Sequence, residues 1–384
     1  LTLSNIAVNQ TNNLYRANFT NTCGTVSSIG GVLTVNVAPV VTANPTSLEV
    51  CTNSVATFNA AATATPAANV QWQVSVCTSG TWTNIAKATG ASFTITSATL
   101  GQSGNSYRAV FTNACGSTTT ASATLTVSQG PTIVMNPVDN TVCEGTAVTF
   151  MSQATGVPTP TVQWEVRTNS GGQWSPISGA NAPNYTISNP IFAQNGRQFR
   201  AVYTNDCGVT PTSFAVLTVN TAPSVSVEPQ DQTVCAGDNA TFTAAATGSP
   251  AATIQWEVST NGTDFTAIPG ANSNTYTFTA GQNDDGNMYH ARFTNLCGDV
   301  ATTAAMLNFY ALPEIVQQPT GVAVCQGESF TLTVGGVGTG LTYQWRKDGI
   351  DIPNSNSASY TVASASASDA GFYSVVVSNI CNQP

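Results

Sequence analysis

Charged residues are scarce in this 384-residue chain: lysine, arginine, aspartate and glutamate together make up 7% of it, with a formal net charge of −9. This negative balance and the lack of any basic cluster argue against binding to nucleic acid or to an anionic membrane surface. The longest apolar runs are no longer than a β-strand, so the sequence predicts no transmembrane helix. We therefore expect neither a nucleic-acid partner nor insertion into a membrane.

Histidine is almost missing, and the residue patterns that hold metal ions are missing too. The single histidine, His290, stands where similar stretches carry arginine: Arg16, Arg108 and Arg200. No Cys-x-x-Cys pair is present, which argues against a zinc site. The acidic pair Asp284-Asp285 could bind calcium weakly, but a solvated turn is the simpler interpretation. We expect no catalytic residue, no metal site and no cofactor.

What the sequence does contain is a repeat. The stretch Tyr107-Arg-Ala-Val-Phe-Thr-Asn-Ala-Cys-Gly116 recurs from Tyr15, from Phe199 and from Tyr289, and in a looser form from Tyr373. The leading aromatic residues are 92, 92, 90 and 84 residues apart. A fixed period of this size indicates an array of similar domains, each as large as a small β-sandwich.

The repeat also predicts the domain boundaries. Residues 1–37 form the C-terminal part of a domain, residues 38–128, 129–220 and 221–310 form three whole domains, and residues 311–384 form a domain without its last strand. Because both ends fall inside a repeat, we expect the sequence to be an excerpt of a longer array. Only three residues separate the strands of successive domains, and such short joints predict a stiff rod.

Inside each repeat, apolar residues alternate with a period of two and are punctuated by glycine, proline, asparagine and serine. This pattern predicts an all-β chain with seven short strands in each domain. Aromatic residues that recur with the period are expected in the cores: Trp72, Trp164, Trp256, Trp345, Tyr107, Phe199, Tyr289 and Tyr373. A second aromatic set, Trp82, Trp174 and Phe265, is expected to pack on the sheet. The alternative for that set is stacking on surface glycans.

The last repeat carries a resemblance to a known family. Gly327-Glu-Ser-Phe-Thr-Leu, Tyr343-Gln-Trp345 and Ser368-Asp-Ala-Gly-Phe-Tyr373 resemble immunoglobulin-like domains of the intermediate (I-set) type. The Val-Cys-x-Gly and Thr-Asn-x-Cys-Gly runs resemble arrays in large secreted or surface proteins of bacteria, especially Bacteroidota. The resemblance implies tandem immunoglobulin-like β-sandwiches stacked end to end into a rod, an extracellular or cell-surface location, and a role in display or adhesion.

One departure from that family concerns the disulfide that normally crosses the core. Its two positions hold small side chains in every repeat: Ala60 and Ala109, Ser152 and Ala201, Ala244 and Ala291, Val334 and Val375. The cysteines lie instead in turns at the two ends of each sandwich. Cys51, Cys143, Cys235 and Cys325 follow the first strand, whereas Cys23, Cys115, Cys207, Cys297 and Cys381 lie in the hairpin after the sixth.

The distance between the two ends decides which pairs can form. Strands of about eight residues separate them by about 25 Å, whereas a disulfide needs Cα atoms about 4.4–6.8 Å apart. Stacked domains would bring the first turn of one to the hairpin of the next, which predicts Cys51–Cys207, Cys143–Cys297 and Cys235–Cys381. Partners of Cys23, Cys115 and Cys325 would lie outside the sequence, and Cys77 is unassigned. Pairing within a domain and free thiols remain alternatives.

These features favour a non-catalytic structural or adhesive segment of an extracellular fibre or cell-surface filament, bound to neighbouring copies of the same repeat protein. The closest alternative is a passive spacer that presents an enzyme or a ligand-binding tip located elsewhere in the parent chain.

Overall fold

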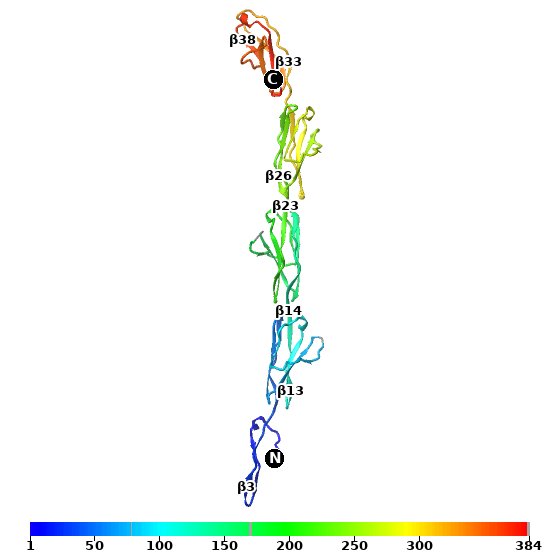
Figure 1. Ribbon diagram of the computed structural model, residues 1–384, viewed down its shortest axis with the longest axis vertical. Helices are drawn as coiled ribbons and strands as arrows, with labels where there is room; N and C mark the ends of the chain where they lie inside the picture. The colour runs from blue at the N-terminus through cyan, green and yellow to red at the C-terminus, as the bar shows by residue number, and fades with distance from the viewer. Residues whose placement is uncertain (78, 169–170, 382–384) are drawn as a thin grey trace. The chain divides into compact units, whose positions relative to one another are not determined.

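The computed structural model describes residues 1–77, 79–168 and 171–381. It forms two compact units, shown along the chain in Figure 1. The first contains Leu1–Thr141, Ala147–Asn189 and Gln194–Thr218, and the second contains Val142–Thr146, Pro190–Ala193 and Val219–Pro384. Every regular element among the described residues is a β-strand or a three-residue 3₁₀ helix. None of the helices in that part of the chain has the length and apolar character needed to cross a membrane.

In the first unit, residues 37–135 form a sandwich of two sheets. The larger sheet contains β6 (Leu48–Cys51), β9 (Asn69–Ser75), β10 (Thr83–Asn84), β12 (Ser106–Asn113), β13 (Gly116–Thr119) and β14 (Ala123–Met135). The opposite layer contains the pairs β5 (Val37–Ala43) with β8 (Ala61–Thr65), and β7 (Ala56–Asn59) with β11 (Ser92–Ile95). The first predicted strand is split because β5 pairs with β8, whereas β6 runs parallel to β14 in the other sheet.

The rest of the first unit repeats or abbreviates this arrangement. The following repeat contributes β16 (Val148–Met151), β17 (Gln153–Val157), β18 (Thr161–Arg167), β19 (Ser175–Pro176), β20 (Asn184–Ile187), β21 (Gln198–Asn205) and β22 (Gly208–Pro211). The N-terminal residues contribute only η1 (Val8–Gln10), β1 (Leu14–Tyr15), β2 (Asn18–Asn21), β3 (Gly24–Ser27) and β4 (Gly31–Val32). Their apolar side chains are largely exposed, because no opposite layer covers them.

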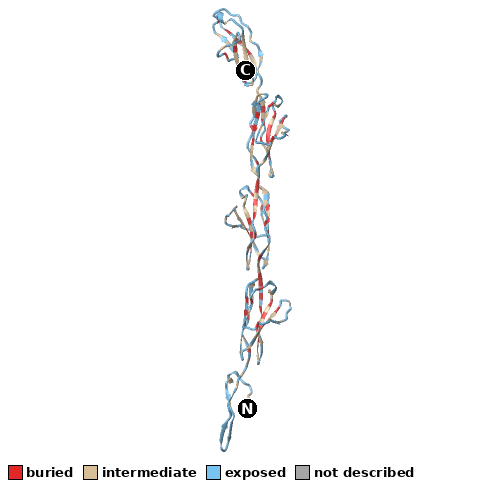
Figure 2. Cartoon of the chain, in the orientation of Figure 1, coloured by how far each residue is buried: buried red, intermediate tan, exposed pale blue. Residues whose placement is uncertain are grey.

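Alternation of side chains explains the sandwich core. Along β12, Tyr107, Ala109 and Phe111 are buried, whereas the residues between them are only partly covered. The four repeating tryptophans, Trp72, Trp164, Trp256 and Trp345, are fully buried, and Figure 2 shows in red the buried residues along the strands. Each indole Nε1–H donates to a backbone carbonyl oxygen 2.8–2.9 Å away. The pairing satisfies the one polar atom of each ring.

Two joints between repeats, those within β14 and within β23 (Ala215–Val227), have no linker, in contrast to the three residues predicted. Strand β14 is thirteen residues long and serves two sheets. Leu125–Ser128 pairs in parallel with β6, and residues 129–135 pair antiparallel with β17. The last strand of one sandwich therefore continues as the first strand of the next. The backbone hydrogen bonds of β14 with β6 are followed directly by those with β17, so this joint contains no loop.

The second unit contains a further complete sandwich and a second one that is more open. The first is built from β24 (Gln232–Val234), β25 (Asn239–Thr243), β26 (Ala245–Ser249), β27 (Thr253–Ser259), β28 (Thr266–Ala267), β29 (Thr275–Thr279), β30 (Met288–Asn295), β31 (Gly298–Ala301) and β32 (Ala305–Phe309). The second is built from β33 (Glu314–Gln317), β34 (Phe330–Thr333), β35 (Gly335–Val337), β36 (Thr342–Lys347), β37 (Ile350–Asp351), β38 (Ser359–Val362) and β39 (Tyr373–Ser378). Strand β23 (Ala215–Val227) leads into this unit, where residues 221–227 pair with β26.

Candidate functional site: disulfides between successive sandwiches

Three disulfides join one sandwich to the next. They link Cys51 to Cys207, Cys143 to Cys297 and Cys235 to Cys381, with Cα atoms 5.6, 5.6 and 5.5 Å apart. These are the pairs predicted from the positions of the cysteines at the two ends of stacked sandwiches, and each lies within one of the two compact units. The six cysteines are half buried. Two thiols about 150 residues apart can meet this closely only if the local structure at both ends holds them in place.

The hairpin end is built by an asparagine. In β21 and β22, Asn205 pairs with Gly208 and leaves Asp206 and Cys207 as a two-residue loop. The Oδ1 atom of Asn205 accepts a hydrogen bond from the backbone N–H of Cys207 at 3.0 Å. Gly208 has φ of +146°, which a residue with a Cβ rarely adopts. The tip that carries the thiol is therefore closed by its own side-chain hydrogen bond.

The same asparagine fixes the hairpin to the rest of the sandwich. Its Nδ2 atom donates to the carbonyl oxygens of Gln129 and Pro158, at 2.8 and 2.9 Å. Gln129 lies in the joint strand β14, so the thiol is positioned relative to the neighbouring sandwich. The backbone of Gly130 also approaches the hairpin closely. A Cβ built at Gly130 would lie 3.2 Å from the carbonyl oxygen of Cys207. A small residue at position 130 allows the hairpin to approach the joint.

Other repeats use the same contacts. Asn113 donates to Val37 and Pro66, Asn295 donates to Thr221 and Pro250, and Asn379 donates to Ala311 and Thr339, all at carbonyl oxygens 2.7–3.1 Å away. The peptide bonds before Pro66, Pro158 and Pro250 are cis. The repeat pattern alone does not predict this role of the asparagine. The signal was present in the invariant asparagine of the Thr-Asn-x-Cys-Gly run, but its acceptors lie far away in the chain.

The other half of the disulfide, Cys51, is the last residue of β6 and is held by β14. It pairs in register with Ser128. The next residue, Thr52, donates its N–H to the carbonyl oxygen of Ser128 at 2.8 Å. In the equivalent turn after β15 (Asn140–Cys143), Glu144 donates to Asn220 at 2.8 Å. Both ends of Cys51–Cys207 and of Cys143–Cys297 are thus tied to one continuous strand, which explains why these pairs form across the joint.

The remaining four cysteines have no disulfide partner among the described residues. Cys23, Cys77, Cys115 and Cys325 are all exposed. Cys23 and Cys115 occupy hairpin tips with the same asparagine closure, at Asn21 and Asn113. Cys325 lies in a turn of the other kind, and Cys77 fits neither class. The prediction that Cys23, Cys115 and Cys325 pair outside this sequence stays a prediction.

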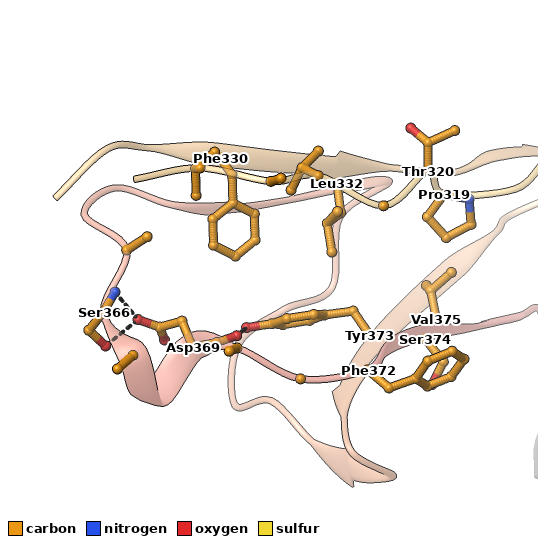
Figure 3. Close-up of a pocket in the computed structure, with 18 of the residues that line it drawn as sticks. Pro319, Thr320, Phe330, Leu332, Ser366, Asp369, Phe372, Tyr373, Ser374 and Val375 are labelled. Carbon is orange, nitrogen blue, oxygen red and sulfur yellow. Dashed lines mark hydrogen bonds between the residues drawn. The ribbon is translucent and has the colours of Figure 1, made fainter. Parts of the chain in front are cut away.

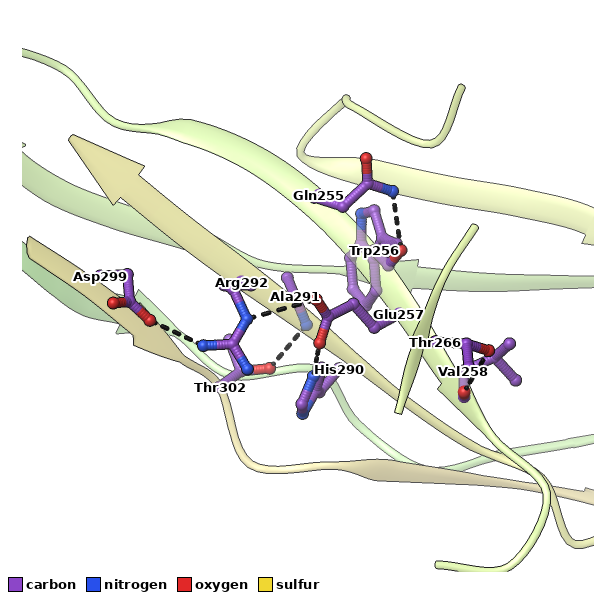
Figure 4. Close-up of polar contacts among 10 residues, drawn as sticks. All are labelled: Gln255, Trp256, Glu257, Val258, Thr266, His290, Ala291, Arg292, Asp299 and Thr302. Atoms are coloured by element: carbon purple, nitrogen blue, oxygen red, sulfur yellow. Dashed lines mark hydrogen bonds and ion pairs between the residues drawn. The ribbon is translucent and has the colours of Figure 1, made fainter. Parts of the chain in front are cut away.

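His290 belongs to a salt-bridge network on the face of a sheet, shown in Figure 4. Its Nε2 atom lies 2.6 Å from Glu257 Oε2, and Arg292 bridges Glu257 at 3.2 Å and Asp299 at 2.7 Å. Burial alone would raise the pKa of the Glu257 carboxyl, but the hydrogen bonds from His290 and Arg292 outweigh it and lower that pKa. In the preceding repeat, Arg200 and Glu165 pair at 2.8 Å at the same place. The network is therefore a variant of a repeated structural contact.

Each ring of the second aromatic set is covered on one face by an arginine or histidine side chain. The guanidinium carbon of Arg108 lies 4.0 Å from the ring centre of Trp82, and that of Arg200 lies 4.3 Å from that of Trp174. Phe265 stacks on the ring of His290 with centroids 3.9 Å apart. One face of each ring is thus already occupied by a side chain of the same sheet, as cation–π and ring stacking allow. This favours packing over glycan stacking.

The acidic pair also has local partners. Asp284 accepts the N–H of Gly281 at 2.8 Å, and Asp285 accepts the N–H of Phe309 at 2.8 Å. Gln10, Gln102 and Asp369 accept the equivalent N–H in other repeats. Among residues 1–77, 79–168 and 171–381, no group of three or more histidine, cysteine or acidic side chains is placed to hold a metal ion.

Comparison with known proteins indicates the class of protein to which this chain belongs. A sequence family described as "Immunoglobulin domain" matches residues 313–379, and a "Domain of unknown function (DUF8696)" matches residues 135–221 and 226–310. The I67–I69 fragment of titin superposes with a TM-score of 0.54 at 16% identity, covering 71% of this chain and 98% of that one. The chain is therefore an all-β protein of tandem immunoglobulin-like domains.

Two curated relatives were also found. Endoglucanase C of Cellulomonas fimi is 40% identical over 195 residues, which cover 50% of this chain and 17% of that protein. Roundabout homolog 1 of Homo sapiens is 29% identical over 268 residues, which cover 65% of this chain and 16% of that protein. The matched region spans only about a sixth of either relative.

Proposed function

We propose that this chain is a non-catalytic structural or adhesive segment of an extracellular fibre or cell-surface filament, as in the bacterial arrays that its motifs resemble. The domains are taken as residues 1–37, 38–128, 129–220, 221–310 and 311–384. The observation that carries the proposal is the set of three disulfides, each of which joins one repeat to the next. Disulfides persist in oxidising compartments, which supports a location outside the cytoplasm.

The disulfides shorten the covalent path through the array. A pulling force that enters at Cys51 crosses to Cys207, follows 28 residues to Cys235, and crosses to Cys381. Those residues can extend to about 100 Å at most. A free repeat of 92 residues would release about 300 Å when it unfolded. Oxidised repeats between Cys51 and Cys381 would therefore resist extension under load.

Single-molecule pulling through the chain ends tests this role. With disulfides intact, we expect no step as long as a whole repeat from residues 51–381, and reduction with dithiothreitol should introduce steps of about 300 Å. The matched control replaces Cys51 and Cys207 by serine, which returns residues 51–143 to the load path and should restore one step of this size. Repeat-length steps in the oxidised wild-type chain would exclude the load-bearing role.

The second candidate is a passive spacer that presents an enzyme or binding tip located elsewhere. The match to endoglucanase C favours it, because that protein extends well beyond the matched region. Electron microscopy of the parent protein separates the two: bundled or helical polymers support a fibre, and isolated stalks with a distinct end support a spacer.

A further inference from the structure

One cavity of the chain lies beside β34 and β39 of the last sandwich and measures about 770 Å³. Phe330, Leu332 and Tyr373 line it, and the Tyr373 hydroxyl donates to the carbonyl oxygen of Asp369 at 2.8 Å, as Figure 3 shows. Tyr373 is only half buried, so the prediction that placed it in the core is only partly met. In the longer array that the repeats predict, a closing strand after residue 381 would fill this cavity. The cavity is therefore no evidence of a ligand.

A second cavity, of about 650 Å³, lies within the complete repeat of residues 129–220. Its described lining comes from β17, the residues around the start of β18, the segment before β20 and the end of β21. All of these elements belong to the first unit. Tyr203 of β21, at 4% exposed, is the one buried residue among those described that line the cavity. This cavity is therefore a feature of a whole repeat, and Tyr203 forms its floor.

Two hydroxyl groups lie at this floor, where the other complete repeats are apolar. The Oη atom of Tyr203 lies 2.8 Å from Oγ of Ser152, and Ser152 Oγ donates to the carbonyl oxygen of Pro183 at 3.3 Å. Because the serine proton is used for Pro183, the Tyr203 hydroxyl donates to Ser152, and its oxygen can accept one more hydrogen bond. The equivalent positions of the other complete repeats hold alanine and phenylalanine: Ala60 and Phe111, Ala244 and Phe293.

The rim of the cavity carries amide and hydroxyl groups but, among the described lining residues, no charge. Gln153 and Asn181 are both exposed there. Gln153 replaces an alanine of the other complete repeats, Ala61 and Ala245. Pro160 and Val162 add apolar surface to the lining. An ionic ligand would lose its hydration in this cavity without gaining a counter-charge, so the lining selects a neutral ligand.

Hydrogen bonds hold the walls of the cavity in place. The Nδ2 atom of Asn205 donates to the carbonyl oxygen of Pro158 at 2.9 Å, which fixes the segment before β18 to the end of β21. The indole Nε1–H of Trp164 donates to the carbonyl oxygen of Ala182 at 2.9 Å, which fixes the segment before β20. A ligand that enters between ordered walls loses little binding free energy to ordering them. The cavity is thus preformed, as small-molecule pockets of about 300–1,000 Å³ usually are.

We propose that this cavity binds a neutral sugar unit of a surface glycan, one or two pyranose rings long. A pyranose carries hydroxyl groups around its edge and C–H groups on its faces. The amides of Gln153 and Asn181 can donate to such hydroxyls and accept from them, and the Tyr203 oxygen accepts one at the floor. Pro160 offers apolar surface to a C–H face. A flat aromatic ligand is disfavoured because the one aromatic ring of the described lining, that of Tyr203, is buried. The site deepens the adhesive role proposed above and rests on it in that respect.

The test measures binding of the 384-residue chain to the neutral disaccharides cellobiose, maltose, lactose and chitobiose, by saturation-transfer NMR and then by calorimetry. We expect at least one of them to bind at a single site. Gln153→Ala and Tyr203→Phe each remove a hydrogen-bonding group, and together they should weaken that binding at least about tenfold. Both variants should fold, because the other complete repeats carry these residues. Thr149→Ala removes a hydroxyl of the same repeat outside the cavity, where it pairs with Thr186, and should leave binding unchanged.

A chain that binds none of these disaccharides would overturn the proposal, and so would binding that the double variant leaves unchanged. Equal binding of the charged sugar glucuronate would contradict a lining that selects neutral ligands. Melting temperatures of the sugar-free variants show whether a loss of binding comes from a loss of fold. Ser152→Ala restores the residue of the neighbouring repeats and should also weaken binding, because the Tyr203 hydroxyl then lacks its partner. Single-chain pulling uses no sugar, so the load-bearing role and this site can each fail without the other.

Discussion

The side-chain amide of Asn205 donates to the carbonyl oxygen of Gln129 across 2.8 Å, although the two residues are 76 positions apart. This contact connects the hairpin that carries Cys207 with the strand that leads out of the preceding sandwich. Asn205 also closes the hairpin on itself through Cys207. A hydrogen bond that orders the thiol before oxidation reduces the entropy lost when the disulfide closes. The asparagine is therefore as much a part of the joint as the cysteine.

Asn205→Asp tests that role. The carboxylate can still accept the N–H of Cys207, but it cannot donate to Gln129 and Pro158. We expect a loss of about 1–3 kcal/mol for acceptors left without a partner and slower formation of Cys51–Cys207, followed by quenched peptide mapping during oxidative refolding. Asn113→Asp makes the same change beside Cys115 and should leave the rate of Cys51–Cys207 unchanged. Equal rates in wild type and Asn205→Asp would contradict the positioning role.

A second prediction concerns the close approach at Gly130. Alanine stands at the equivalent positions 38 and 222 of other repeats, so Gly130→Ala should be accommodated with a small shift of the hairpin. Gly130→Val adds a branched side chain against the carbonyl of Cys207, which we expect to cost about 1–3 kcal/mol by overpacking. The measurement is the fraction of Cys51–Cys207 at equilibrium in a glutathione buffer, with Cys235–Cys381 as an internal reference. An equal loss in both variants would show that backbone freedom, not space, is what Gly130 provides.

The sequence contains enough to predict the fold and the location of the cysteines, because both follow from local periodicity. Alternating residues define each strand, and the spacing of 35 residues between Trp72 and Tyr107 recurs between Trp164 and Phe199. What the sequence did not show depends on contacts between distant residues. The acceptors of Asn205 lie 76 and 47 positions away. The continuous strand at Ser128–Pro131 forms because β17 pairs with it, against the local signal of Gly130-Pro131 for a break. Tertiary hydrogen bonding overrides that signal.

The salt-bridge network of Glu257 predicts an acid-sensitive region. The pKa of the Glu257 carboxyl is lowered in the folded chain. The network therefore stabilises the fold at a pH above the ordinary carboxyl pKa of about 4.3, and this stabilisation is lost as the pH falls through the pKa of the folded chain. Amides of β30 should lose protection from hydrogen exchange over that range, after correction for intrinsic rates. Glu257→Gln should lower protection at pH 7 and flatten the dependence. Glu165→Gln, in the first unit, is the control and should not alter β30.

The raised pKa of Tyr289 predicts that the folded chain also loses stability at alkaline pH. Burial raises the pKa of its phenol to about 12, above the ordinary value of about 10. The unfolded chain therefore releases this proton first, and the stability that Tyr289 contributes is present below about pH 10 and is lost as the pH rises towards about 12. Phe199 occupies the equivalent position in another repeat, so Tyr289→Phe should fold and pack normally. The melting temperature of the variant should fall less steeply between pH 10 and 12, roughly the interval between the two pKa values. Ultraviolet titration should show one fewer late-ionising tyrosine. Identical slopes for the two proteins would mean that this phenol is already ionised, or already exposed, before the fold is lost.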